Sequence, residues 1–136
     1  MKPVFGDTAY FLALLNRADQ HHKRAVALSQ APPGPLLTTD WILAEVGNVL
    51  RAPPLRPRFV RLMELLQRQP DVELVEASRE LFRRGCAMFR ARPEKDWSLT
   101  DCISFLVMSD HGVTDALTTD LHFEQAGFRV LMKVAA

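Results

Sequence analysis

The sequence has few of the features that mark special protein classes. It contains only two cysteines, Cys86 and Cys102, and neither has a partner at the spacing of a metal site. Both stand in apolar helical contexts, so we expect small buried thiols and a reduced, cytoplasmic setting. No apolar run approaches the length of a membrane span, and the N-terminus lacks the basic start, apolar run and cleavage site of a signal peptide. We therefore expect no membrane segment.

The overall composition is equally unexceptional. Hydrophobic residues make up 48% and charged residues 24% of the chain, which excludes disordered, collagen-like and coiled-coil classes. A length of 136 residues is enough to bury a core without disulfides or a structural metal. We expect one domain over residues 1–136.

Charge is nearly balanced overall but divided unevenly along the chain. Residues 51–95 hold 11 of the 17 Lys and Arg but only 6 of the 16 acids, so this stretch is net +5 and the remainder net −4. Such a division suits a protein that concentrates acids around a metal and offers basic residues to a polyanion. Ordinary solvated helix faces would give the same counts, so both interpretations stay open. The basic candidates are Arg56, Arg58, Arg61 and Arg68.

Short apolar runs alternate with longer periodic ones, which predicts strands alternating with helices around a mostly parallel sheet. We predict five strands, at residues 3–6, 36–38, 72–75, 116–118 and 128–131. Helices are expected at 10–15, 20–30, from a cap at Asp40 to Leu50, 58–69, 78–92, 100–109 and 121–126. Their predicted core faces include Val49 in the third helix and Leu65 in the fourth.

Two of the candidate acids follow predicted strands. Asp7 comes directly after the first strand and Asp120 after the fourth, and the carboxyl ends of parallel strands are where open sheets place ligands. Each could equally cap the helix that follows. Asp40, in a matching Thr-Thr-Asp segment, has the same local chemistry as Asp120, so local sequence does not separate them.

Two further acids lie on predicted helices. Asp101 opens the most apolar helix, and Ser98-x-x-Asp101 matches a capping box, a role that is compatible with binding a ligand. Glu45 lies more than a turn inside its helix, where neither a cap nor a turn explains an acid. A solvated surface position is its ordinary alternative.

The four acids can face one crevice. Clustered carboxylates raise one another's pKa, so such a group is normally avoided unless a cation neutralises it. Mg²⁺ and Mn²⁺ are hard, oxygen-seeking ions that match this donor set and can activate water for attack on a phosphodiester.

Four segments together resemble the acidic motifs of PIN domains, in order and in spacing. They are Val4-Phe5-Gly6-Asp7-Thr8-Ala9-Tyr10, Leu43-Ala44-Glu45-Val46, Trp97-Ser98-Leu99-Thr100-Asp101-Cys102 and Leu117-Thr118-Thr119-Asp120 with Phe123. The resemblance spans essentially the whole chain and is nearest to the small VapC toxins of bacteria and archaea. One departure is Ala9, where many family members carry Asn.

The resemblance implies a three-layer α/β/α sandwich, RNA cleavage dependent on Mg²⁺ or Mn²⁺, a homodimer and a cognate antitoxin. It implies Asp7, Glu45, Asp101 and Asp120 as catalytic metal ligands, with Thr8, Thr118 and Asp96 in support. Thr118 is suited to a hydrogen bond with a carboxylate or water, and Asp96 is expected at the periphery.

The four histidines are interpreted as capping or surface residues, because Mg²⁺ prefers oxygen ligands. They are His21, His22, His111 and His122.

Three rival hypotheses remain. A stand-alone RNA-processing nuclease would need no antitoxin, and a catalytically silent PIN fold would be a binding scaffold. A phosphoacceptor receiver domain would need an acidic pair after the first strand, where Phe5-Gly6 stands here, and a lysine better placed than Lys133.

Overall fold

The computed structural model describes residues 2–133. Every predicted strand and helix is present, with small shifts of the ends. The strands are β1 (Val4–Gly6), β2 (Leu36–Thr39), β3 (Val72–Val75), β4 (Asp115–Leu117) and β5 (Arg129–Val130). The helices are α1 (Thr8–Leu15), α2 (His22–Gln30), α3 (Asp40–Val49), α4 (Arg56–Arg68), α5 (Arg79–Ala91), α6 (Leu99–Asp110) and α7 (His122–Gln125).

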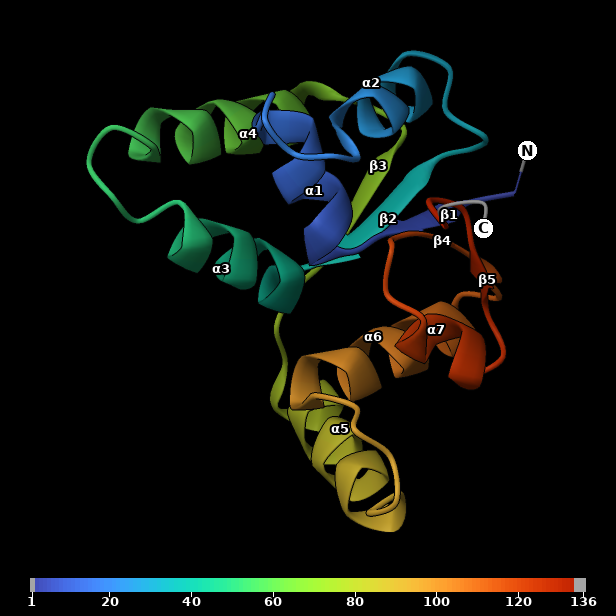
Figure 1. Ribbon diagram of the computed structural model, residues 1–136. Coiled ribbons are helices and arrows are strands. Elements are labelled where there is room, and N and C mark those ends of the chain that lie inside the picture. The colour runs from blue at the N-terminus through green and yellow to red at the C-terminus, as the bar shows by residue number, and fades with distance from the viewer. Residues whose placement is uncertain (1, 134–136) are drawn as a thin grey trace.

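The five strands form one sheet in the order β3-β2-β1-β4-β5, and all four pairings are parallel. From β1 the chain moves outward through β2 to β3, then returns to β4 and β5 on the other side of β1. Because parallel crossovers are right-handed, this reversal places the helices on opposite faces. Figure 1 shows α1, α2 and α4 above the sheet and α5, α6 and α7 below it. The predicted three-layer sandwich is confirmed.

The core lies on both faces of β1, which is buried along its length. Phe5 points into it with no exposed surface and lies near Phe123, with ring centroids 6.2 Å apart. Phe105 of α6 meets Phe123 edge-on at 5.0 Å. These contacts pack α6 and α7 against the sheet at β1. Asp7 follows β1 and Asp120 follows the neighbouring strand β4.

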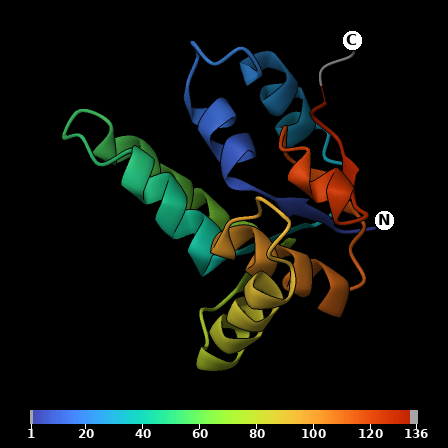
Figure 2. The ribbon, with the colours of Figure 1, turned by 60° about the horizontal axis from the view of Figure 1, so that its bottom comes forward.

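Helices α5 and α6 pack against each other at Gly85, as the side-by-side ribbons in Figure 2 show. A Cβ atom at Gly85 would lie 2.4 Å from Cγ1 of Ile103, so only glycine permits this approach. With Gly85 facing α6, the next residue, Cys86, is exposed. The expectation of a buried thiol was therefore wrong for Cys86, whereas Cys102 is buried as predicted.

Three other details of the prediction were wrong. The cap of α3 is Thr39, whose hydroxyl accepts the N–H of Ile42, while the Asp40 carboxylate accepts the N–H of Ala77 at 2.8 Å. Val49 and Leu65, assigned to core faces, are 53% and 44% exposed. Val49 is in the last turn of α3, which runs out past the strands together with the start of α4 (Figure 2), so it has less core to cover it. Leu65 is near the other end of α4, where it borders an open apolar groove beside the buried Leu62 and Leu66. Among the described residues, no helix is long and apolar enough to cross a bilayer.

Candidate functional site

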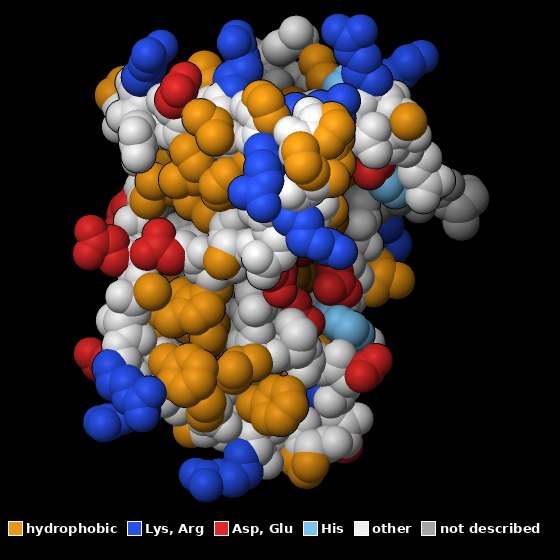
Figure 3. Space-filling model, turned by 90° about the vertical axis from the view of Figure 1, so that its left-hand side faces the viewer, with side chains coloured by type: hydrophobic (Ala, Val, Ile, Leu, Met, Phe, Trp, Pro, Cys, Tyr) orange, Lys and Arg blue, Asp and Glu red, His pale blue; other side chains and the backbone are white. Residues whose placement is uncertain are grey.

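A cleft of about 430 Å³ opens at the carboxyl ends of β1 and β4, where the strand order reverses. This is the position at which open parallel sheets bind ligands. Its lining contains all four predicted acids, together with Asp96, Thr8, Ala9, Leu12, Ser98 and His122. Figure 3 shows acidic side chains beside a histidine in a hollow on this face. The tertiary structure thus brings together residues that are far apart in the chain.

Asp7 lies at the bottom of the cleft, with only 7% of its surface exposed. It occupies the N-cap position of α1, yet its side chain makes no capping hydrogen bond. Instead, its Oδ2 accepts a hydrogen bond of 2.6 Å from the Thr118 hydroxyl. Burial raises the pKa of Asp7 to about 6, against the lowering effect of Thr118. The capping alternative is therefore not what holds this carboxylate, and Thr118 makes the hydrogen bond suggested for it.

Glu45 enters the cleft from α3, half-buried, and is not simply solvated. Its Oε1 accepts a hydrogen bond of 2.6 Å from the Thr8 hydroxyl at the start of α1. Because α1 packs against α3, this bond between the two helices fixes the carboxylate where they meet at the cleft. Thr8 and Thr118 thus do the same thing for two different acids: each orients a carboxylate with one short hydrogen bond.

Asp101 performs the predicted capping role and also lines the cleft. Its Oδ2 accepts the N–H of Ser98 at 3.1 Å, and its own N–H donates to the Ser98 hydroxyl at 2.9 Å. Burial raises the pKa of Asp101 as well. Capping and a place in the cleft coexist here because the first turn of α6 opens directly onto it.

The structure separates the two Thr-Thr-Asp segments that local sequence could not. Asp120 follows β4, next to β1, and lies in the cleft; its N–H donates to the Thr118 hydroxyl at 3.0 Å. Asp40 follows β2, is exposed, and binds the backbone of Ala77. The difference comes from strand order, because only β4 lies beside β1 on the side where the crossover reverses.

His122 is the residue that sequence reasoning missed. The surface interpretation was wrong for it, since its Nδ1 lies 3.3 Å from both Asp101 Oδ2 and Asp120 Oδ1. Its spacing of two residues from Asp120 was the available signal. By contrast, His22 contacts the carbonyl of Ala13, and His111 contacts Val107 and Glu73, so neither lines the cleft.

The donor chemistry of the cleft fits a hard divalent cation. Five carboxylates line it, and none of the described lysines or arginines does. Of the four predicted metal ligands, only Asp101 and Asp120 have an ion-pair partner among residues 2–133, and that partner is His122. A group with this much uncompensated negative charge is stabilised by a bound cation. Their role as ligands stays a prediction.

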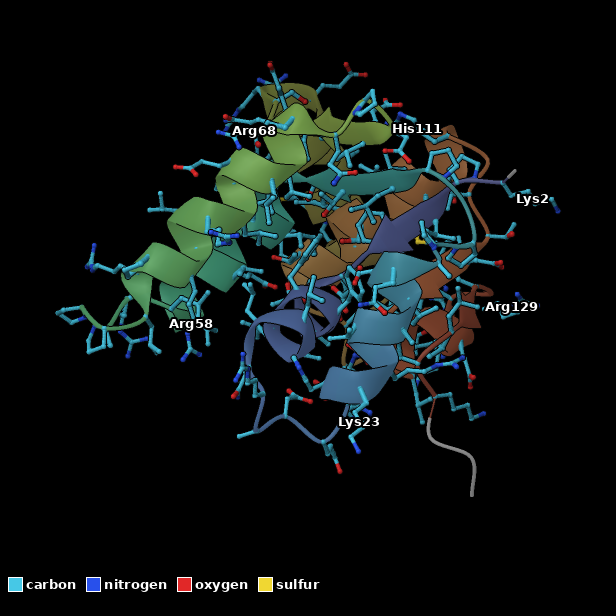
Figure 4. All side chains as sticks on the ribbon, turned by 90° about the horizontal axis from the view of Figure 1, so that it is seen from above. Lys2, Lys23, Arg58, Arg68, His111 and Arg129 are labelled. Carbon is cyan, nitrogen blue, oxygen red and sulfur yellow. The ribbon has the colours of Figure 1, made fainter. Side chains whose placement is uncertain are left out.

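The predicted arginines of α4 lie outside the cleft. Figure 4 places Arg58 and Arg68 toward opposite ends of the helix, so the four do not form one compact patch. Arg58 donates to the carbonyl of Leu15 and Arg56 to that of Arg51. A contact with RNA therefore stays a prediction for this group.

Comparison with known proteins identifies the family. The PIN domain model matches residues 4–129. The 23S rRNA-specific endonuclease VapC20 of Mycobacterium tuberculosis is 26% identical over 125 residues, which cover 92% of this chain and 95% of that protein.

Solved structures agree with this match. The crystal structure of M. tuberculosis VapC20, described as a sarcin–ricin loop cleaving toxin, superposes with a TM-score of 0.82 at 25% identity, covering 92% of this chain and 95% of that one. FitAcB of Neisseria gonorrhoeae, with a TM-score of 0.65 and 15% identity over 93% and 95% of the two chains, shares the fold. The receiver hypothesis is thereby excluded, and the chain belongs to the PIN domain family.

Proposed function

We propose that this protein is an endoribonuclease that hydrolyses RNA phosphodiester bonds with the help of Mg²⁺ or Mn²⁺. The observation that carries the proposal is the cleft of five carboxylates, without a described lysine or arginine, at the reversal of strand order. Similarity to an rRNA endonuclease over nearly the whole chain supports RNA as the substrate.

Asp7, Glu45, Asp101 and Asp120 are the proposed ligands. Thr118 holds Asp7 and Thr8 holds Glu45, so both carboxylates are oriented before a cation arrives. Asp96 is exposed at the rim, in keeping with a peripheral role. When bound, the cation would supply an activated water and offset the charge that develops on the scissile phosphate.

The surroundings of the cleft suit a polyanion. Figure 3 shows Lys or Arg side chains beside the acidic hollow, on the face that the net-positive stretch helps to form. Basic side chains at the rim attract the phosphate backbone, while the acids within hold the cation. This arrangement favours an active nuclease over a silent scaffold.

We further propose that the protein is the cytoplasmic toxin of a type II toxin–antitoxin pair and acts as a homodimer. The similarity to a protein described as a toxin supports the first point. Figure 3 shows apolar side chains gathered into patches on the face of the cleft, and the exposed apolar residues of the helices include Val49, Val60 and Phe89 at 52–53% exposure; gathered apolar surface supports a protein partner. A stand-alone RNA-processing nuclease is the alternative. It predicts that expression of this protein does not arrest cell growth, and that co-expression of the gene beside its own has no rescuing effect.

The decisive experiment is cleavage of end-labelled RNA by purified protein. We expect cleavage with Mg²⁺ or Mn²⁺, none with EDTA, and none for Asp7→Asn or Asp101→Asn. Asp40→Asn is the matched control, since it changes the equivalent Thr-Thr-Asp segment outside the cleft and should cleave normally. Cleavage that persists in EDTA, or in Asp7→Asn, would refute the assignment.

A further inference from the structure

His122 stands between two of the proposed metal ligands because of a local turn. Its backbone N–H donates to Asp120 Oδ1 at 2.9 Å, which turns the chain so that the first residue of α7 points back toward Asp120. The imidazole then lies beside Asp101 on α6, 21 residues away in the chain. The backbone hydrogen bond thus fixes where the side chain of His122 begins, and the contacts of Nδ1 with the two carboxylates orient the ring.

The three side chains have the spacing of ligands around one ion. Imidazole Nδ1 is 3.3 Å from each carboxylate oxygen, and one ligand atom from each residue lies within 4.8 Å of the others. Neighbouring ligands of an octahedral ion with bonds of about 2.1 Å are about 3.0 Å apart. A small movement would bring all three atoms onto one cation.

The second ring nitrogen, Nε2, has no contact within the described residues that would prevent His122 from binding a metal ion through Nδ1. No described residue binds Nε2, and 29% of the side chain is exposed. Metal-bound histidines usually donate their second N–H to a carboxylate, a carbonyl or water, and water can serve here. Among residues 2–133 the ring is held only through Nδ1, by the two carboxylates, and a cation bound between the three side chains would replace that contact.

We infer that His122 is a direct nitrogen ligand of the cation, next to Asp101 and Asp120, and that it makes the site prefer Mn²⁺ over Mg²⁺. Carboxylates alone serve both ions, whereas an imidazole favours transition metals, because Mg²⁺ strongly prefers oxygen. The inference rests on the proposed cation-dependent function, and it adds a fifth residue to the four acids of the motifs.

Pulsed electron paramagnetic resonance of Mn²⁺ bound to the purified protein tests the ligand directly. We expect a coupling from ¹⁴N of imidazole in the wild type that is absent in His122→Asn. The asparagine amide can still donate a hydrogen bond to the carboxylates, so a histidine that only positioned them would be replaced. His111→Asn, which changes a histidine outside the cleft, should keep the coupling.

Calorimetric titration with each ion supplies a second readout. In His122→Asn we expect Mn²⁺ affinity to fall about tenfold or more, with Mg²⁺ affinity changed much less. Mn²⁺ that binds the wild type without nitrogen coupling, or equal losses for the two ions, would overturn the inference and leave the nuclease proposal intact. Failure of both ions to bind, with cleavage persisting in EDTA, would overturn the proposed function as well.

Discussion

Replacing Asp7 with asparagine should stabilise the metal-free protein while abolishing its activity. The carboxylate is almost wholly buried, and burial raises its pKa from 3.8 to about 6. Above pH 6 Asp7 is therefore ionised in both states, and its negative charge costs more free energy in the buried site of the folded protein than in the unfolded chain. A difference of about two pKa units corresponds to about 3 kcal/mol, since each unit is worth about 1.4 kcal/mol.

The pH dependence fixes the sign of this effect. Below pH 3.8 Asp7 is protonated in both states and contributes no destabilisation. As pH rises from about 4 to about 6, the unfolded chain loses its proton first, so the wild type loses stability relative to Asp7→Asn. We expect the variant's advantage to be about half its full value at pH 5 and complete by about pH 7.

Asparagine suits the test because it has nearly the same shape as aspartate and its carbonyl can still accept the Thr118 hydrogen bond. Urea unfolding in EDTA at pH 5.0 and 7.5 gives the two free energies of unfolding, with Asp40→Asn as the exposed control. For a domain of this size, about 3 kcal/mol corresponds to a rise in Tm of roughly 10 °C. Saturating Mg²⁺ should narrow the gap, because the wild type gains binding energy that the variant lacks. A variant that is less stable than wild type at pH 7.5 in EDTA, or an advantage that does not change with pH, would refute this reasoning.

Other substitutions test the supporting contacts. Gly85→Ala should lower the free energy of unfolding by about 1–3 kcal/mol, because the added methyl group meets Ile103 and this clash outweighs the better helix propensity of alanine. Chemical denaturation measures this loss, and an unchanged midpoint would contradict the close packing of α5 and α6. Thr8→Val removes the hydrogen bond that orients Glu45 and should weaken Mg²⁺ binding about 10- to 100-fold with little loss of stability, as calorimetry would show. Thr118→Val removes a contact that lowers the pKa of Asp7, so the acidic limb of the pH–rate profile should move to higher pH. An unchanged pH–rate profile would show that Thr118 does not influence the ionisation of Asp7.

Much of the fold was predictable because its signals are local. Apolar runs, Pro and Gly breaks and helical periodicity are read within a few residues, and they placed all twelve elements. Most of the errors concern the exposure of single side chains, which depends on how the helices pack. Cys86 is exposed because Gly85 takes the contact with α6, and Val49 is exposed because α3 runs on beyond the strands.

The site divides in the same way. The sequence by itself determined the candidate acids, through motif order and through Glu45, an acid that no cap explains. It could not choose between Asp120 and Asp40, since identical Thr-Thr-Asp segments carry identical local information. Only tertiary structure made that choice, because β2 and β4 both flank β1 but the strand order reverses on the side of β4. Only tertiary structure brought His122 onto Asp101, because contacts between distant segments depend on strand order and helix packing.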